Sequence, residues 1–359
     1  MKKKCLLVLA PLSLILLFPL AYFFYCKMTL MGMEDDATIA YLLSHKYPVD
    51  AEDIRIPLSF GKGIEMGKDH VFLFGETHGF SPSQLMDAKL LIYLNKNHDV
   101  RTYGAEIFAE DAHKLNQVLG SEQLDERLLV SVINDISRDT PQSKTVDCLN
   151  KWKLIYDYNR QVDKEHKIYV LGLLGKKNAY QENLRDEVMA RTFQTFANDP
   201  RNEDWVRNGC YCFVGLTHAY QSPYLYKGHE IPTFGSILKE HLFSVTSMIQ
   251  MSIDSYCYLP KNDEMISPPG EKTKYVSSNG PICFYNNVVN LEKASEGVKA
   301  AIYSLGDEDS PFWSCDDLVG YRSSIPSLAQ PYSGLSTYST MDYFQYVFLI
   351  RDAQAPKAI

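Results

Sequence analysis

Short apolar runs alternate with longer stretches of helical periodicity through the middle of the chain. The apolar runs cover residues 70–75, 101–106, 166–172, 211–215 and 243–251, and each has the length and the β-branched or aromatic content of a strand. Between them, helices are expected at residues 82–97, 108–119, 146–163 and 178–198. Strands that alternate with helices form mostly parallel sheets. The pattern therefore predicts an α/β fold with a mostly parallel central sheet and helices on both faces.

Two of the expected helices begin with capping signals. Ser81 is expected to be an N-cap, followed by Pro82 at the first helical position and by Gln84 as the capping-box residue. A weaker signal, Asn178 with Gln181, precedes an apolar stripe in the last of the four helices. We therefore expect these two helices to begin close to residues 81 and 178.

The chain changes character after the fifth apolar run. Residues 252–340 are rich in Pro, Ser, Gly and Tyr and contain few periodic segments, which predicts an irregular C-terminal flank around the core. Residues 341–352 have the composition of a final buried strand. We expect residues 70–359 to form one α/β domain, preceded by a linker and N-terminal extension over residues 28–69.

The most apolar segment lies at the N-terminus. Residues 5–26 carry no charged side chain and follow three consecutive lysines at positions 2–4. A run of this length can span a bilayer with the lysines on the cytoplasmic side. Residues 1–27 are therefore predicted to be a signal anchor, favoured over a cleaved signal peptide because the small residues of a cleavage site are missing. The rest of the chain is expected outside the cytoplasm, membrane-anchored, or secreted or periplasmic if the segment is cleaved.

The charge of the chain bears on its partners. The 359 residues carry a net charge of −8, and no basic stripe exists outside the first four residues. Because nucleic acids are bound largely through their phosphates, a nucleic-acid partner is excluded. The expected partners are a small-molecule or peptide substrate and, through residues 5–26, the membrane.

Export also affects how the cysteines are interpreted. Six of the eight lie outside the apolar segment, which permits up to three disulfides in an oxidising compartment, with buried free thiols as the alternative. Cys210 and Cys212 stand two residues apart in a strand, so they face the same way and would need other partners.

Polar residues follow three of the expected strands. Glu76 and His78 come directly after the first strand, Glu106 ends the second, and His218 follows the fourth. Because the carboxyl ends of parallel strands meet at one edge of a sheet, these side chains are expected to converge. A single histidine after a strand is usually a surface or capping residue. Two Gly-x-x-His units at matching strand ends, with an acidic residue at a third, favour a functional site.

The order of these motifs resembles the erythromycin esterase family and its ChaN-like and Tiki relatives. The resemblance rests on VFLFGETHGFSPSQLMDAKLLIYL, YGAEIF, LRDEVMARTFQTF and FVGLTHAY, and on FQYVFLIRDAQAP near the C-terminus. It covers residues 70–250 with gaps, and residues 341–356. The esterases carry an Asp after the third strand and a His-Asn-x-His motif, where this chain has Leu173 and the pair Leu216-Thr217. These departures weaken the expectation of a macrolide substrate.

The resemblance implies a site that hydrolyses an ester, lactone or amide by activating water. His78 would be the general base, and Glu106 would orient His78 or the water. His218 would donate a proton to the leaving group or hold the substrate, and Glu76 would support the loop or add a second carboxylate. No Gly-x-Ser-x-Gly motif stands near a strand end, which disfavours a serine hydrolase.

Arg185 is the last residue that the resemblance brings to the site. It would clamp a carboxylate or stabilise an oxyanion, with a surface salt bridge to Asp186 or Glu187 as the alternative.

The relatives imply two further alternatives. Tiki-type proteases bind a divalent metal ion through paired Gly-x-x-His motifs and a glutamate, so His78, Glu106 and His218 would be the ligands of a metal-dependent protease. ChaN-like proteins resemble haem-binding lipoproteins, and a non-catalytic haem binder would use the tyrosine cluster at positions 220, 224 and 226.

Overall fold

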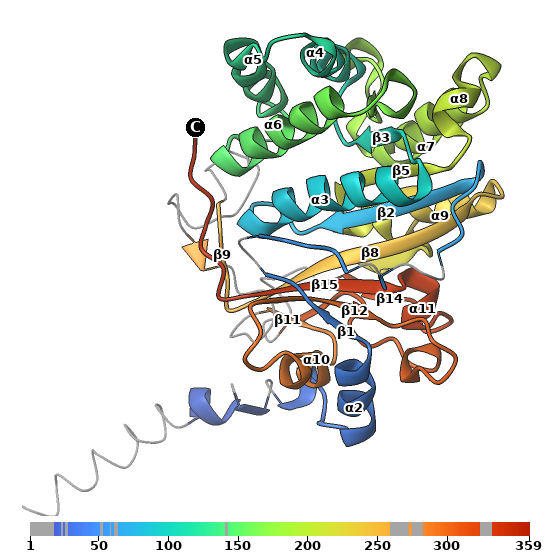
Figure 1. Ribbon diagram of the computed structural model, residues 1–359. Coiled ribbons are helices and arrows are strands. Elements are labelled where there is room, and N and C mark those ends of the chain that lie inside the picture. Colours follow the sequence, from blue (N-terminus) through green and yellow to red (C-terminus); the bar gives the residue numbers. More distant parts are fainter. Residues whose placement is uncertain are drawn as a thin grey trace, which may run out of the picture.

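A mixed sheet covered by helices forms the centre of the molecule. The computed structural model describes residues 18–22, 24–25, 28–50, 53–57, 59–60, 64–140, 143–258, 273–274, 283–323 and 332–359. Within them, eight strands form the main sheet in the order β1-β12-β15-β8-β2-β5-β3-β4 (Figure 1). Neighbouring strands from β15 to β4 are parallel, whereas β12 is antiparallel to both of its neighbours. The predicted α/β fold with a mostly parallel sheet is confirmed.

The strands of the main sheet come from most of the chain. They are β1 (Lys46–Pro48), β2 (His70–Glu76), β3 (Thr102–Ala105), β4 (Tyr169–Gly172), β5 (Cys210–Gly215), β8 (Ser244–Ile253), β12 (Ala300–Ser304) and β15 (Tyr346–Arg351). Smaller sheets contain β6 (Tyr224–Tyr226), β7 (His229–Ile231), β9 (Tyr256–Cys257), β10 (Thr273–Lys274), β11 (Cys283–Tyr285), β13 (Tyr321–Ser323) and β14 (Tyr332–Gly334).

Helices cover both faces of the main sheet. One face packs against α3 (Ser81–His98), α4 (Ala109–Gly120), α5 (Glu126–Ile136) and α6 (Val146–Gln161). The other face packs against α7 (Arg185–Ala197) and α9 (Phe234–Glu240) on one half, and against α2 (Asp36–Ser44), α10 (Val289–Ala294) and α11 (Thr340–Tyr343) on the other half. The short α8 (Glu203–Val206) and the 3₁₀ helices η2 (Lys164–His166), η3 (Lys177–Ala179), η4 (Glu182–Leu184), η5 (Pro200–Asn202), η6 (Leu216–Ala219) and η7 (Pro311–Trp313) complete the connections.

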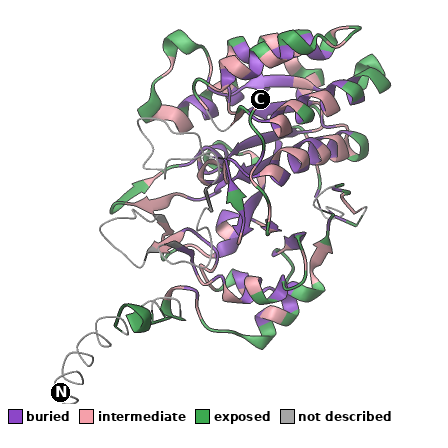
Figure 2. Cartoon of the chain, turned by 90° about the vertical axis from the view of Figure 1, so that its left-hand side faces the viewer, coloured by how far each residue is buried: buried purple, intermediate pink, exposed green. Residues whose placement is uncertain are grey.

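The alternation of side chains along a strand explains why both faces need cover. Phe72 and Phe74 of β2 belong to the core under α3–α6, while Val71 and Leu73 belong to the core under α7 and α9. Every residue of β2 and β5 is buried. Figure 2 shows that buried residues, coloured purple, are concentrated in the central sheet and on the helix faces that cover it. A strand buried on both faces reads as a continuous apolar run, which is the pattern that made these strands recognisable.

The predicted start of α3 near residue 81 is confirmed, whereas its capping residues and the start of the second helix differ from the prediction. Phe80 is the N-cap of α3, no side chain caps that helix, and Gln84 donates its amide hydrogen bond to Glu76 instead. The segment from 178 forms the short helices η3 and η4, and α7 begins only at Arg185. Gln84 does not cap α3 because the buried carboxylate of Glu76 lies within reach of its amide and accepts the hydrogen bond instead.

The C-terminal part contributes more regular structure than its composition indicated. Within residues 252–340, β12 enters the main sheet between β1 and β15, and α10 packs on its face. Residues 341–352 contain β15, preceded by the last residues of α11. The strand β12 (AAIYS) is short and lacks a helical neighbour with clear periodicity, which is why the sequence pattern did not reveal it.

The N-terminal and cysteine predictions meet the structure only in part. Residues 1–17, 23, 26 and 27 of the predicted anchor lie outside the described residues, and within the described part no helix is both long and apolar enough to cross a membrane. Five described cysteines are free thiols, so the expected disulfides are not found among them: Cys148, Cys210, Cys212, Cys257 and Cys315. Cys210 and Cys212 do face the same way, into one apolar cluster under α7 and α9 that offers them no disulfide partner.

A buried ion pair links the helices of one face to the centre of the sheet. Lys151 of α6 lies 2.9 Å from the carboxylate of Asp87 of α3, and both side chains are almost inaccessible, at 6% and 0% exposure. The same carboxylate accepts hydrogen bonds from the hydroxyls of Tyr103 of β3, at 2.6 Å, and Tyr211 of β5, at 2.8 Å. One carboxylate therefore joins two helices and two neighbouring strands.

Replacing Lys151 by Met is expected to destabilise the fold strongly, because Asp87 would remain buried without its cation. Breaking such a pair costs about 3–5 kcal/mol. The matched control is Lys153→Met on the same helix, where the lost pair with Glu126 is partly exposed and contributes about 0–1 kcal/mol. Urea unfolding measures both free energies, and equal losses in the two variants would contradict the importance of the buried pair.

Candidate active site

The predicted site residues lie at the carboxyl edge of the parallel strands. Glu76 is the last residue of β2 and pairs in register with Gly215, the last residue of β5. Glu106 follows β3 directly, and His218 lies in η6, which begins where β5 ends. Strand register therefore brings together residues that are up to 142 positions apart in the sequence.

The first part of the site is a pair formed by Glu76 and His78. Nδ1 of His78 lies 2.9 Å from Oε1 of Glu76, and the amide of Gln84 donates to Oε2 of the same carboxylate at 3.1 Å. Because a carboxylate only accepts hydrogen bonds, Nδ1 carries a proton, so Nε2 is the atom that gains or loses a proton when this ring titrates. The His78 side chain is 37% exposed, so this ring is accessible from solvent.

The turn after His78 depends on a glycine. Gly79 has φ +88°, and a β-carbon at this position would lie 2.4 Å from the carbonyl oxygen of Tyr258. Only glycine combines this backbone conformation with such close approach. The last glycine of the Gly-Glu-Thr-His-Gly motif therefore fixes the loop that carries the imidazole.

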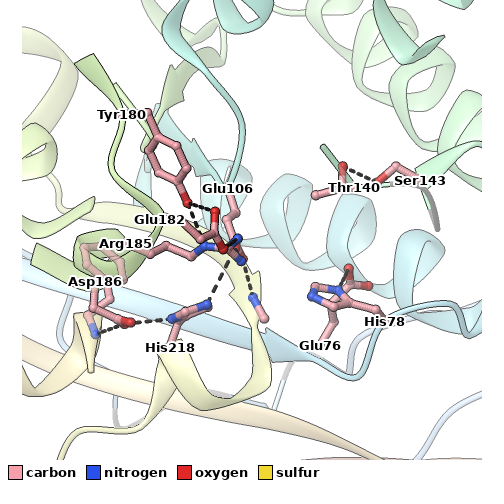
Figure 3. Close-up of polar contacts among 12 residues, drawn as sticks. Glu76, His78, Glu106, Thr140, Ser143, Tyr180, Glu182, Arg185, Asp186 and His218 are labelled. Atoms are coloured by element: carbon pink, nitrogen blue, oxygen red, sulfur yellow. Dashed lines mark hydrogen bonds and ion pairs between the residues drawn. The ribbon is translucent and has the colours of Figure 1, made fainter. Parts of the chain in front are cut away.

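The second part of the site is centred on Glu106, which is buried. Its Oε2 accepts a hydrogen bond from the backbone amide of Gly215 at 2.8 Å. Its Oε1 lies 3.2 Å from Nη1 of Arg185 and 3.5 Å from Nε2 of His218 (Figure 3). Glu106 thus contacts Arg185 and His218, whereas the expected orientation of His78 is performed by Glu76.

His218 has a carboxylate partner of its own. Its Nδ1 lies 2.7 Å from Oδ1 of Asp186 in the first turn of α7. The same oxygen accepts a hydrogen bond from the backbone amide of Phe234, the first residue of α9. Asp186 is therefore held in place by a helix N-terminus while it holds the imidazole.

The two histidines meet at Gly215. A β-carbon on this residue would lie 3.1 Å from Nε2 of His78 and 3.3 Å from Cδ2 of His218. The two rings thus lie against the same backbone atom, next to the amide that binds Glu106. Glycine at this position lets the two imidazoles approach each other.

Arg185 is surrounded by groups from the segment that precedes its helix. Its Nε donates to the hydroxyl of Tyr180 at 2.8 Å, and its Nη2 pairs with the exposed carboxylate of Glu182. Among the acidic residues considered as surface partners, neither Asp186 nor Glu187 pairs with it in the structure; Glu106 and Glu182 do. The guanidinium therefore joins the η3–η4 segment to the carboxylate at the centre of the site.

The carboxylates give the two histidines different proton affinities. Burial disfavours the charged ring of His218, but the negative charges of Glu106 and Asp186 outweigh it and raise its pKa to about 9. Burial likewise disfavours the charged ring of His78, but the hydrogen bond and charge of Glu76 raise its pKa above the ordinary value. Burial alone would raise the pKa of Glu106, but the surrounding cations, His218 first, lower it. At neutral pH, His218 is therefore a cation and Glu106 an anion.

A cavity of about 50 Å³ opens beside these groups. Its outer wall is formed by the carboxylates and the accessible imidazole, and its inner wall by aromatic and aliphatic residues under α5 and α6. The lining includes Glu76, His78, Glu106, Gly215, Tyr103, Lys151, Trp152 and Phe213. An imidazole, His78, and a buried ammonium, Lys151, thus both line a partly open space with several apolar side chains, which is the usual character of a small-molecule site.

The residues fit neither alternative cofactor well. Among the described residues, no three His, Cys, Asp or Glu side chains are arranged to hold a metal ion. His78, Glu106 and His218 are therefore not arranged as the three ligands of one ion. Tyr220, the first tyrosine of the expected haem cluster, is 1% exposed, and its hydroxyl accepts a hydrogen bond from the amide of Gly320.

Several polar residues of the site escaped the sequence analysis. Asp186, Tyr180, Glu182 and Gln84 all contact a predicted site residue. Asp186 was considered only as a surface partner of Arg185. Adjacent residues on a helix face different directions, so Asp186 does not face Arg185. Its position in the first turn of α7 therefore indicates a partner other than the neighbouring arginine.

Comparison with known proteins identifies the fold. The chain resembles a solved protein of Bacillus cereus, with 12% identity and a TM-score of 0.60 over 91% of this chain and 100% of the other. It also resembles a protein described as a succinoglycan biosynthesis protein, with 13% identity and a TM-score of 0.60 over 91% of this chain and 99% of the other. A mutant erythromycin esterase in its open conformation matches with 11% identity and a TM-score of 0.48 over 83% of this chain and 93% of the other. No protein-family model and no curated protein sequence matches the chain.

The raised pKa of His218 predicts how stability depends on pH. A histidine with a pKa of about 9 in the folded state and about 6.5 when unfolded stabilises the fold fully below pH 6.5, and this contribution is lost as pH rises through 9. The free energy of unfolding of the wild type, relative to His218→Gln, should therefore fall by up to about 3 kcal/mol between pH 6 and pH 9.5. Denaturant unfolding at both pH values measures the difference, and a constant difference would mean that the carboxylates do not hold the proton on His218.

Proposed function

We propose that the chain is a hydrolase that activates water for attack on an ester, lactone or amide. The observation that carries the proposal is the meeting of two carboxylate-bound imidazoles at Gly215, beside a cavity. One imidazole is accessible and has a free basic nitrogen, while the other carries a proton at neutral pH. A base and an acid with separated proton affinities are what general acid–base hydrolysis requires.

The reaction begins at His78. Nε2 of the neutral ring removes a proton from a water molecule as the water oxygen attacks the carbonyl carbon, and Glu76 stabilises the imidazolium that forms. The negative charge that develops on the carbonyl oxygen is stabilised by the cations beside Glu106. His218 donates its proton to the leaving group as the carbon–oxygen or carbon–nitrogen bond breaks, and the products are an acid and an alcohol or amine.

Glu106 has a positioning role in this scheme. It contacts Arg185, His218 and the amide of Gly215, and none of these contacts reaches the ring of His78. Its negative charge keeps His218 protonated and fixes the guanidinium near the reacting carbon. Neutralising Glu106 would therefore weaken the acid and leave the base in place.

The N-terminal segment is the basis of a proposal about where the chain is located. We propose that residues 5–26 anchor it in a membrane and that the hydrolase faces outward. The proposal rests on the uncharged run after three lysines and on exposed apolar side chains within the run and just after it. Phe18 is 73% exposed and Met28 is 72% exposed, which is unusual for such large apolar groups unless lipid or protein covers them.

Removing the base should abolish most of the hydrolysis of a panel of esters, lactones and amides. His78→Gln is expected to lower kcat/KM on the best substrate by about 10²–10⁴-fold, because a positioned acid or base contributes about that much. Glu106→Gln is expected to lower it less, because this change weakens the acid but removes neither proton-transferring group. Initial rates of acid release measure the effect. His166→Gln and Glu126→Gln, which alter side chains on the surface, are the matched controls and should retain the wild-type rate.

The pH profile separates the two roles. Because the pKa of His78 is raised above its ordinary value, the kcat/KM of the wild type should rise with pH as His78 loses its proton. The kcat/KM should then fall near pH 9, where His218 loses its proton. Hydrolysis that survives in His78→Gln, or that is absent from the whole panel, contradicts the proposed function.

A further inference from the structure

The inner wall of the cavity contains a lysine that the proposed reaction does not use. Lys151 is 6% exposed, and its ammonium lies 4.6 Å from the ring centre of Phe213 and 5.0 Å from that of Trp152. Two hydrogen bonds engage it, one to Asp87 and one to the hydroxyl of Tyr103 at 3.3 Å. An ammonium has three N–H donors, so one donor remains among the aromatic rings that line the cavity.

An acceptor without a partner lines the same cavity. The side-chain oxygen Oε1 of Gln84 is buried and has no hydrogen-bond partner, while its amide nitrogen is held by Glu76. A buried acceptor that stays unpaired costs about 1–3 kcal/mol. Lys151 and Gln84 therefore give the cavity one unused donor and one unpaired acceptor, in addition to the carboxylates and the imidazole that also line it.

The size of the cavity limits what can enter. One water molecule needs on the order of 10–15 Å³ of such space, so a cavity of about 50 Å³ holds a group of about three or four non-hydrogen atoms. A macrocyclic ring is far larger. A short chain attached to a carbonyl placed at His78 would fit inward, toward Lys151.

We propose that this inner pocket binds a short acyl group that carries a hydroxyl, with Lys151 as the donor and Gln84 as the acceptor for that hydroxyl. A hydroxyl both donates and accepts, so it satisfies the two unused groups together. A carboxylate suits the pocket less, because Asp87 already neutralises the ammonium and two further carboxylates stand at the outer wall. The inference rests on the proposed hydrolase function and specifies its substrate as a short hydroxyacyl ester.

The test compares methyl 3-hydroxybutyrate, methyl butyrate and methyl hexanoate as substrates of the full chain. The kcat/KM should be about tenfold higher for the hydroxy ester than for butyrate, because of the hydrogen bond to a charged group. It should be about tenfold lower for hexanoate, because two further carbons overfill the cavity. Equal rates on butyrate and the hydroxy ester, or on butyrate and hexanoate, overturn the proposal.

Two pairs of variants assign the effect to the pocket. Ile136→Ala enlarges the cavity and should raise the hexanoate-to-butyrate ratio of kcat/KM about tenfold. Ile133→Ala on the same helix removes a core side chain outside the cavity and should leave this ratio unchanged.

The second pair of variants tests the hydrogen bond to the hydroxyl. Lys151→Met should abolish the preference for the hydroxy ester, and Lys153→Met should keep it. Because Lys151→Met is destabilised, the double variant Lys151→Met with Asp87→Asn repeats the measurement without a buried unpaired charge. A preference that survives in both overturns the role of Lys151.

Failure of the hydrolase function is distinguishable from failure of the pocket. If the wild type hydrolyses none of the esters, the proposed function is wrong, and the pocket is tested by saturation-transfer NMR with methyl 3-hydroxybutyrate. Transfer that is stronger than for methyl butyrate and disappears in the double variant supports the pocket. Equal transfer to both esters, or none, overturns it.

Discussion

The ion pair between Asp87 and Lys151 is the contact on which the arrangement of the site depends. Taking two charges out of water is costly, so the pair persists only because additional hydrogen bonds complete it. Those bonds come from Tyr103 of β3 and Tyr211 of β5. Glu106 directly follows β3, and Gly215 is the last residue of β5. The helices α3 and α6 are thereby fixed against the two strands that deliver the central carboxylate and the backbone amide that binds it.

The same network connects the fold to the chemistry. Lys151 forms part of the wall of the cavity into which His78 faces, so the group that locks the helices also borders the proposed acyl pocket. At the outer wall, the neighbouring carboxylates give two chemically identical side chains, His78 and His218, different roles. His78 has one carboxylate partner and stays accessible, whereas His218 lies between Asp186 and Glu106 and is held as a cation. Carboxylate placement, rather than the histidines themselves, separates base from acid.

Sequence patterns predicted the strands of the parallel sheet and the edge at which the site residues meet. That success has a physical basis, because a strand buried on both faces must be continuously apolar and a parallel sheet must place its carboxyl ends together. The pairing of side chains was not predictable in this way. Whether His78 bonds Glu76 or Glu106 depends on side-chain geometry, and the partnership of Asp186 with His218 crosses 32 residues of sequence. The buried pair of Asp87 and Lys151 could not be predicted from the sequence either. In the sequence alone, each residue has the pattern of an ordinary surface charge on a helix.

The most direct test of the account is an NMR titration of the two imidazoles in protein labelled with ¹⁵N at histidine. Spectra recorded from pH 5 to pH 10, with His78→Gln and His218→Gln for assignment, follow the protonation of each ring nitrogen. We expect His218 to stay doubly protonated through neutral pH and to titrate near pH 9, and His78 to titrate separately and to keep its remaining proton on Nδ1. Two histidines that titrate together near their ordinary pKa would contradict the division into base and acid on which the proposed hydrolysis rests.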